Sequence, residues 1–278
     1  MTMLAGLWRS PLFLLGALLF STTLLLAVVA PWCIDVNTTE RVGLAYVPPS
    51  AEHWLGTDHL GIDLVSLHIR GLRASLYVGL LSGVIATAIG TVIGVYGGYK
   101  GGVIDDLLTS LTNLFLVIPT LVVLILLSNS FEQGRSLTLI ALIIGGTTWT
   151  WTARAVRAQS ASVRTRDHVA LARINGYGTL GIIFLYILPY LLSYLFMVFI
   201  LQTATGILTE ASLSMLGLGP HDSVSLGSIL NEAIKNEALT DGAWWAFLPA
   251  TLLITIIAFS LYVINTAMEA VFNPRLRR

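Results

Sequence analysis

The chain has 278 residues, of which 55% are hydrophobic and 11% are charged, and its mean hydropathy is +0.82. Because soluble domains carry about 25% charged residues, this composition excludes ordinary soluble enzymes, secreted modules and nucleic-acid-binding proteins. The 15 basic residues balance the 15 acidic ones, and a single cysteine excludes an internal disulfide.

Six stretches that carry almost no charge predict an all-α polytopic membrane protein. A helix needs about 20 apolar residues to cross the ~30 Å hydrocarbon core of a bilayer. No internal repeat or flexible linker separates the stretches, so we expect residues 1–278 to form a single transmembrane domain. The expected spans cover residues 11–32, 74–96, 107–128, 136–153, 182–209 and 243–268.

The basic residues predict which side of the membrane each connecting segment faces. If these segments alternate between the two sides, ten basic residues fall on one side and five on the other. Basic residues are retained on the cytoplasmic side during insertion, so six spans place both termini in the cytoplasm. Segments 33–73 and 210–242 then face outward, and segment 154–181 faces inward. The ten inner basic residues are Arg9, Lys100, Arg154, Arg157, Arg164, Arg166, Arg173, Arg275, Arg277 and Arg278.

Small residues recur along one side of the second stretch. Ala86, Gly90, Gly94 and Gly98 fall four residues apart, and Gly79 and Gly83 begin a second stripe. Helices in a bilayer associate through close backbone packing, which glycine permits. We therefore expect a structural interface here rather than a direct role in transport. In the later stretches, Pro119 and Pro189 each remove a helical hydrogen bond and predict a kink.

Polar residues within the spans are uncharged. Asn113, Gln202 and Thr205 could line a transport pathway or form hydrogen bonds between helices, and the sequence leaves both open. Proton pumps, ion-coupled carriers and voltage sensors place ionisable residues within the membrane. The near absence of such residues argues against these three classes.

The inward segment contains a predicted short helix. Asp167 suits its first turn, where the helix dipole favours a carboxylate, and Gly176 suits its end. A helix of about two and a half turns gains its stability from packing. Its apolar residues predict docking in the groove of a partner protein. The alternatives are packing against the chain's own bundle and a cytoplasmic loop that has no partner.

The sequence carries no motif for catalysis or nucleotide binding. It has no P-loop of the form G-x-x-x-x-G-K-[ST], and its five histidines show no metal-ligand spacing. We therefore expect no catalytic residue, bound metal or cofactor in this chain, and any uphill transport must draw its energy from a source outside this chain.

Four segments resemble a known family. Residues 164–176, followed by Tyr186-Ile-Leu-Pro189, resemble the EAA loop of permease subunits in bacterial ABC importers, here about residues 160–181. Three further segments are similar to the C-type subunit of the dipeptide/oligopeptide/nickel permease family. They are Leu55-Gly-Thr-Asp58-His-Leu-Gly61-Ile-Asp63, Glu210-Ala-Ser-Leu-Ser-Met-Leu-Gly-Leu-Gly219 and Asn273-Pro-Arg275.

This resemblance implies a type I ABC importer permease of the bacterial inner membrane. It implies a heterodimer with a second permease, two ATPase subunits that bind ATP and Mg, and an extracytoplasmic solute-binding protein. Coupling to an ATPase would involve Asp167, Ala172, Arg173 and Gly176. The outer loops and gate would involve Asp58, Gly61, Asp63, Glu210, Ser212 and Gly217.

The chain also departs from the family pattern. The family usually has Arg where Ile62 and Leu67 stand, and Trp where Leu226 precedes Gly227. These changes indicate a divergent branch, so the transported solute, whether a peptide, a metal chelate or an oligosaccharide, stays open. Two other classes are kept as alternatives: an ion-coupled secondary carrier and a structural membrane subunit without a pathway of its own.

Overall fold

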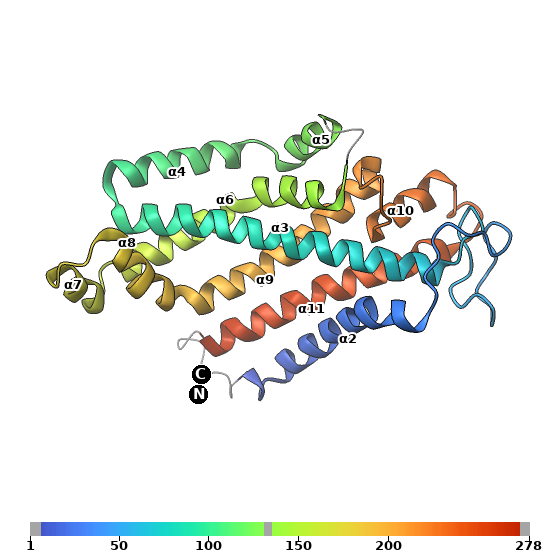
Figure 1. Ribbon diagram of the computed structural model, residues 1–278, viewed down its shortest axis with the longest axis horizontal. Helices are drawn as coiled ribbons and strands as arrows, with labels where there is room; N and C mark the ends of the chain where they lie inside the picture. The colour runs from blue at the N-terminus through green and yellow to red at the C-terminus, as the bar shows by residue number, and fades with distance from the viewer. Residues whose placement is uncertain (1–6, 131–134, 273–278) are drawn as a thin grey trace.

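Helix α3 (Leu64–Lys100) runs along the centre of the structure, a computed structural model that describes residues 7–130 and 135–272. Helices α6 (Leu137–Val163) and α9 (Leu188–Leu213) pack along it, and α2 (Pro11–Cys33) pairs with α11 (Leu248–Phe272) on another side (Figure 1). Within these described ranges the chain has no β-strand, only two isolated β-bridges. The predicted all-α fold class is confirmed.

Side-chain caps fix where the long helices begin. Asp63 accepts a hydrogen bond from the Ser66 N–H (3.0 Å) at the start of α3, and Ser136 accepts one from the Leu139 N–H (3.2 Å) at the start of α6. Such caps satisfy amide groups that have no partner within the helix. The second predicted span is therefore longer than residues 74–96, because its helix begins where Asp63 caps it.

The two stripes of small residues contact two different helices. Gly94 lies against Ala153 and Val156 of α6, and Gly83 lies against Thr203 of α9. A β-carbon on Gly94 would come within 2.6 Å of the Ala153 carbonyl oxygen, and one on Gly83 within 2.6 Å of Thr203 Oγ1. The predicted structural interface is confirmed, since only a residue without a β-carbon allows these backbones to approach so closely.

Both prolines interrupt regular helix, in different ways. At Pro119 the helix breaks, so that α4 (Gly102–Val117) and α5 (Thr120–Ser130) are bent by 79°. A proline disfavours the helical conformation of the residue before it, and Ile118 is accordingly extended. The break at Pro119 is therefore sharper than the predicted kink. At Pro189 the chain stays helical, with the π-helical segment η1 (Ile183–Ile187) immediately before α9; such π segments accommodate an interrupted hydrogen-bond ladder.

Shorter elements complete the chain at its two ends. Helix α7 (Asp167–Ile174) and the single turn α8 (Thr179–Ile182) lie at one end of the bundle (Figure 1). At the other end, α9 passes into the π-helical segment η2 (Ser214–Leu218), followed by α10 (Leu226–Lys235) and the 3₁₀ turn η3 (Trp244–Ala246).

Four helical stretches in the described ranges are long and apolar enough to cross a membrane, and the bent pair α4–α5 makes five if it counts as one span. The four are Pro11–Cys33, Leu64–Lys100, Thr179–Leu218 and Trp244–Val271. Helix α6 has 27 residues, but threonines, tryptophans and arginines lower its hydropathy. Six crossings with both termini in the cytoplasm therefore stay a prediction.

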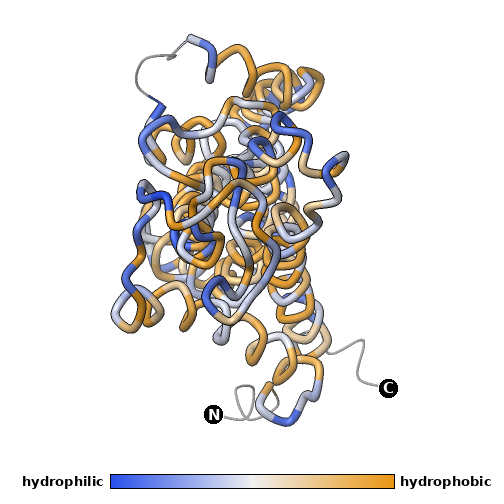
Figure 2. The backbone as a smooth tube through the Cα atoms, turned by 90° about the vertical axis from the view of Figure 1, so that its right-hand side faces the viewer, coloured by the Kyte–Doolittle hydropathy of each residue, from blue (hydrophilic) through white to orange (hydrophobic). Residues whose placement is uncertain are grey.

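The α10 end of the bundle is more hydrophilic than the helices behind it (Figure 2). The segment between α2 and α3 and helix α10 lie at one end, and α2 begins and α11 ends toward the end that carries α7 (Figure 1). Figure 2 looks along the bundle from the α10 end and shows hydrophilic segments in front of predominantly hydrophobic helices. This distribution fits an apolar helical bundle with a wet face at the α10 end.

Candidate coupling helix, outer segments and pathway cavity

Helix α7 has the predicted boundaries. It begins at Asp167, directly after the extended residue Arg166, and Asn175 follows its last residue. Gly176 adopts a left-handed conformation (φ +81°) and its N–H donates to the Arg173 carbonyl oxygen (3.0 Å). This is the common way for a helix to end, because glycine adopts positive φ without a steric penalty.

The two sides of α7 have different surroundings. Val169 and Ala172 are buried in an apolar cluster with Tyr99 and other residues of the chain's own bundle. Leu171 and Ile174 are 59% and 81% exposed. The small side chain of Ala172 faces inward and lets α7 approach the bundle, and its coupling role stays a prediction. The large exposed apolar residues are Leu171 and Ile174.

Arginines fasten this end of the bundle. The Arg173 guanidinium lies over the ring of Tyr99, 5.2 Å from its centroid, a distance typical of a cation–π contact. Arg157 Nη2 donates to Asp105 Oδ2 (2.6 Å) in a bidentate ion pair that joins α6 to α4. These contacts hold α7 and its supporting helices in one orientation. Arg173, predicted as a coupling residue, thus packs on its own chain.

The predicted outer residues Asp58, Gly61 and Asp63 build one turn. Asp58 Oδ1 accepts hydrogen bonds from the N–H groups of Leu60 and Ile62 (both 2.8 Å). Gly61 has φ +79°, and a side chain at this position would collide with the Gly43 carbonyl oxygen. Asp63 then caps α3. The three residues therefore connect the outer segment rigidly to the start of the central helix.

Glu210 and Ser212 differ from the expectation that they lie in an outer loop, because both belong to helix α9. The Glu210 carboxylate is fully buried and accepts hydrogen bonds from Ser75 Oγ (2.8 Å) and Ser214 Oγ (2.6 Å). Ser75 Oγ in turn accepts from the Leu226 N–H at the start of α10 (3.2 Å). Glu210 thus joins α3, α9 and α10, whereas the exposed Ser212 bonds only within its helix.

Gly217 occupies the turn after this network. Its φ is +80°, inside the π-helical segment η2, and it lies beside Asn231. Asn231 Nδ2 donates to the Met215 carbonyl oxygen (2.7 Å), which fixes α10 to the turn. Burial of this amide is balanced by the hydrogen bond. The predicted outer segment 210–242 is therefore an ordered cap on the bundle, and a gating role for its residues stays a prediction.

Gln202 and Thr205 share a cavity of about 610 Å³ between α5, α6, α9 and α11. Gln202 Nε2 donates to Thr152 Oγ1 (2.7 Å) and to the Thr148 carbonyl oxygen (3.2 Å). Gln202 therefore both bridges two helices and lines a cavity. Asn113 is placed elsewhere: it accepts a hydrogen bond from Arg154 Nη2 (2.9 Å) beside a smaller, separate cavity of about 170 Å³.

The polar wall of the larger cavity comes from a motif that the sequence reasoning missed. Residues 147–152 read Thr-Thr-Trp-Thr-Trp-Thr, and five of the six line the cavity. The hydroxyls and indole rings in an otherwise apolar stretch of sequence indicate such a wall, because polar groups in a membrane helix need a hydrogen-bond partner or a wet surface. The motif places hydrogen-bonding groups along α6 where it faces the cavity.

Comparison with known proteins decides the family. The model for binding-protein-dependent transport system inner membrane components matches residues 90–278, more than half of the chain. The chain belongs to this family. It is 31% identical over 270 residues to the oligopeptide transport system permease protein OppC of Bacillus subtilis (strain 168), covering 96% of this chain and 87% of that protein.

Two further relatives are also permease proteins of peptide transport systems. The dipeptide transport system permease protein DppC of Bacillus subtilis (strain 168) is 30% identical over 273 residues, 97% of this chain and 84% of DppC. OppC of Mycobacterium bovis (strain ATCC BAA-935 / AF2122/97) is 32% identical over 212 residues, 76% of this chain and 72% of that protein. This binding-protein-dependent transport component is a transmembrane permease subunit of an ABC importer in the inner membrane, as the resemblance predicted.

Proposed function

We propose that this permease forms half of the translocation pathway for peptides and couples to an ATPase through the exposed edge of α7. The observation that carries the proposal is the division of α7 into a face that packs on its own bundle and an edge that exposes Leu171 and Ile174. An apolar edge on a helix held from behind fits a groove on a partner protein. The membership in a binding-protein-dependent family supports ATPase and binding-protein partners.

The finer assembly follows the family resemblance. We expect a heterodimer with a second permease, two ATPase subunits that bind ATP and Mg, and an extracytoplasmic binding protein that delivers the solute. Six crossings with cytoplasmic termini agree with the placement of α7 near the same end as the start of α2 and the end of α11 (Figure 1). Segment 154–181 also carries five of the arginines that favour the inner side.

The cavity beside Gln202 and Thr205 supports a passage for a small polar solute. Its volume of about 610 Å³ falls within the ~300–1,000 Å³ of ordinary small-molecule sites, and its wall combines threonine hydroxyls with aromatic rings. The names of the relatives refer to oligopeptides and dipeptides. We expect Gln202→Leu to change the rates of transport of different peptides relative to one another, because it removes a hydrogen-bonding group from the wall.

The decisive experiment replaces Ile174. Burying an isoleucine side chain contributes about 1.5–3 kcal/mol, so Ile174→Asp should weaken ATPase binding by about 10- to 100-fold. Leu239→Asp is the matched control, because Leu239 is 77% exposed at the opposite end of the bundle. ATPase co-purification and ATP-dependent peptide uptake are measured for both variants. Equal ATPase retention in the two would refute the coupling role of α7.

An ion-coupled carrier is not favoured, because the chain belongs to a family of binding-protein-dependent transport components. The same uptake assay separates the two mechanisms. Uptake by an ABC importer stops when ATP is depleted and continues when the ion gradient is collapsed. An ion-coupled carrier gives the opposite pair of results.

A further inference from the structure

A cavity of about 600 Å³ lies toward the end of the bundle opposite α7, where α2 ends and α6 begins beside α3 (Figure 1). Pro31 lines it from the last turns of α2, and Leu137 lines it from the first turn of α6. Because Pro31 is close to the end of a stretch that is long and apolar enough to cross a membrane, the cavity lies at the level where the helices leave the hydrocarbon. We call it the arginine cavity.

Two arginines of α3 line the arginine cavity and give it a positive charge. Arg70 and Arg73 are both exposed and lie three residues apart, on the same side of the helix. Neither guanidinium makes an ion pair or a hydrogen bond with another residue in the part of the chain that the structure describes. Asp35 is the acidic residue among those that line the cavity, so two positive charges face one negative charge.

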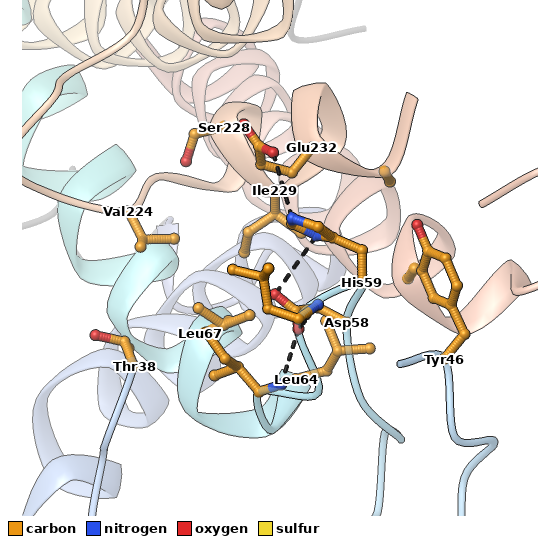
Figure 3. A pocket seen from close by; sticks show the side chains of 14 residues that line it. Thr38, Tyr46, Asp58, His59, Leu64, Leu67, Val224, Ser228, Ile229 and Glu232 are labelled. Carbon is orange, nitrogen blue, oxygen red and sulfur yellow. Dashed lines mark hydrogen bonds and ion pairs between the residues drawn. The ribbon is translucent and has the colours of Figure 1, made fainter. Parts of the chain in front are cut away.

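Other acidic side chains at this end of the bundle already have partners. Asp63 accepts the Ser66 N–H at the start of α3. Asp58 and Glu232 face His59 across a separate, smaller cavity, with nitrogen–oxygen distances of 3.7 Å to each carboxylate (Figure 3). These carboxylates therefore do not neutralise the arginines. Like charges one helical turn apart repel each other, and an anion bound from outside the chain would relieve that repulsion.

The exposed side of α3 changes in polarity along its length. Tyr77 also lines the arginine cavity, and its hydroxyl oxygen lies 3.0 Å from Thr138 Oγ1 of α6. Leu80, Val84 and Ala88 then follow at intervals of three or four residues and are exposed. This side of the helix thus passes from arginine through tyrosine to aliphatic residues. The same order is found from the headgroups of a bilayer to its hydrocarbon.

A phospholipid matches both the charge of the cavity and the apolar side of α3 below it. The planar guanidinium of arginine pairs with a phosphate through two parallel hydrogen bonds, and the aliphatic residues suit an acyl chain that extends from the same headgroup. A cavity of about 600 Å³ also falls within the ~300–1,000 Å³ of small-molecule sites. It shares no lining residue with the cavity beside Gln202, which separates it from the proposed passage of the solute.

We propose that the arginine cavity binds the phosphate of an anionic phospholipid. The phosphate pairs with Arg70 and Arg73 and balances the excess positive charge, and one acyl chain lies along Leu80 and Val84. Because α2, α3 and α6 all line the cavity, the bound lipid holds these three helices together at one membrane surface. The proposal requires only that the chain lies in a membrane, so it stands independently of coupling through α7.

The test measures lipid binding to the complete importer in detergent by native mass spectrometry. Phosphatidylglycerol is the anionic probe, and phosphatidylcholine is the zwitterionic one. Replacing Arg70 and Arg73 by glutamine should weaken phosphatidylglycerol binding by about fivefold for each arginine and remove one tightly bound lipid. Binding of phosphatidylcholine should change much less. Unchanged affinity for phosphatidylglycerol in the doubly substituted importer would overturn the proposal.

Two further variants control for effects on the fold. Arg41→Gln is the matched control, because Arg41 is exposed at the same end of the bundle but does not line the cavity; it should leave the affinity for phosphatidylglycerol unchanged. Replacing Arg70 and Arg73 by lysine keeps both charges and should retain most of the binding. If Arg41→Gln weakens binding as much as the two glutamine substitutions, the attraction is a general surface effect and the proposal is wrong.

Competition experiments distinguish the lipid from other anions. Inorganic phosphate at the concentration of the lipid should not displace phosphatidylglycerol, because it has no acyl chain to pack on α3. Displacement by inorganic phosphate would show a phosphate site instead of a lipid site. Displacement by a transported peptide with a free carboxyl terminus, but not by its amidated form, would assign the cavity to the solute. Loss of the second permease from the importer with both glutamines would assign it to that subunit, and each of these three results overturns the proposal.

Discussion

Replacing Gly94 by alanine tests whether close backbone contact holds the centre of the bundle together. The added β-carbon would lie 2.6 Å from the Ala153 carbonyl oxygen, 2.9 Å from the Arg157 nitrogen and 3.0 Å from Val156 Cβ. Carbon atoms normally pack ~3.5–4.0 Å apart, so α3 and α6 must separate locally by roughly 1 Å. Such overpacking costs about 1–3 kcal/mol, and the better helix propensity of alanine offsets about 1 kcal/mol of that cost.

Gly146→Ala is the matched control, because Gly146 is exposed in the middle of α6 and its added β-carbon would meet no side chain or neighbouring helix within 4 Å. The Gly146→Ala variant gains the better helix propensity of alanine without a steric clash. The two variants should therefore differ by about 1–3 kcal/mol, or roughly 2–12 °C in Tm. Thermal unfolding of the purified chain in detergent, followed by fluorescence of its seven tryptophans, measures the difference. Equal melting temperatures would refute the close-contact explanation.

Three further predictions concern topology and the outer end. Cys33 is exposed and is the only cysteine of the chain, so a membrane-impermeant maleimide should label it in intact spheroplasts. Ile174→Cys in a Cys33→Ser background should react only after permeabilisation. Labelling of residue 174 in intact spheroplasts would contradict the orientation. Glu210→Ala should lower the free energy of unfolding by more than ~2 kcal/mol, because two buried serine hydroxyls lose their acceptor. The control Ser212→Ala should change it by less than about 0.5 kcal/mol. Similar melting temperatures of the two variants would contradict the buried network. Asp63→Ala removes the cap of α3 and should cost about 1 kcal/mol in the same assay, and an unchanged Tm would show that the cap is dispensable.

The helical core was predictable because its determinants are local. A charge-free stretch within a membrane has to form its backbone hydrogen bonds internally, and it therefore folds as a helix. Glycines four residues apart mark the side of that helix that another helix can approach closely. The sequence does not say which helix approaches. That Gly94 meets α6 and Gly83 meets α9 depends on the packing of the whole bundle.

The candidate sites were predictable only in part. The boundaries of α7 follow from Asp167 and Gly176, but both sides of this short helix are apolar, so burial of Ala172 and exposure of Ile174 emerge only from tertiary packing. Helix α10 was missed, although it begins with a capping box at Ser225 and Ser228 and has apolar residues at helical spacing. Its closeness to the charged residues of the first outer segment could not be read from positions some 170 residues apart.

Helix α3 has one mechanical consequence. Its 37 residues form a single rod about 55 Å long, with the Asp58 turn at one end and the cluster that supports α7 at the other. No proline interrupts it, and glycines along its middle lie against α6 and α9. We therefore expect that a displacement of its inner end would reach its outer end only if α6 and α9 moved with it.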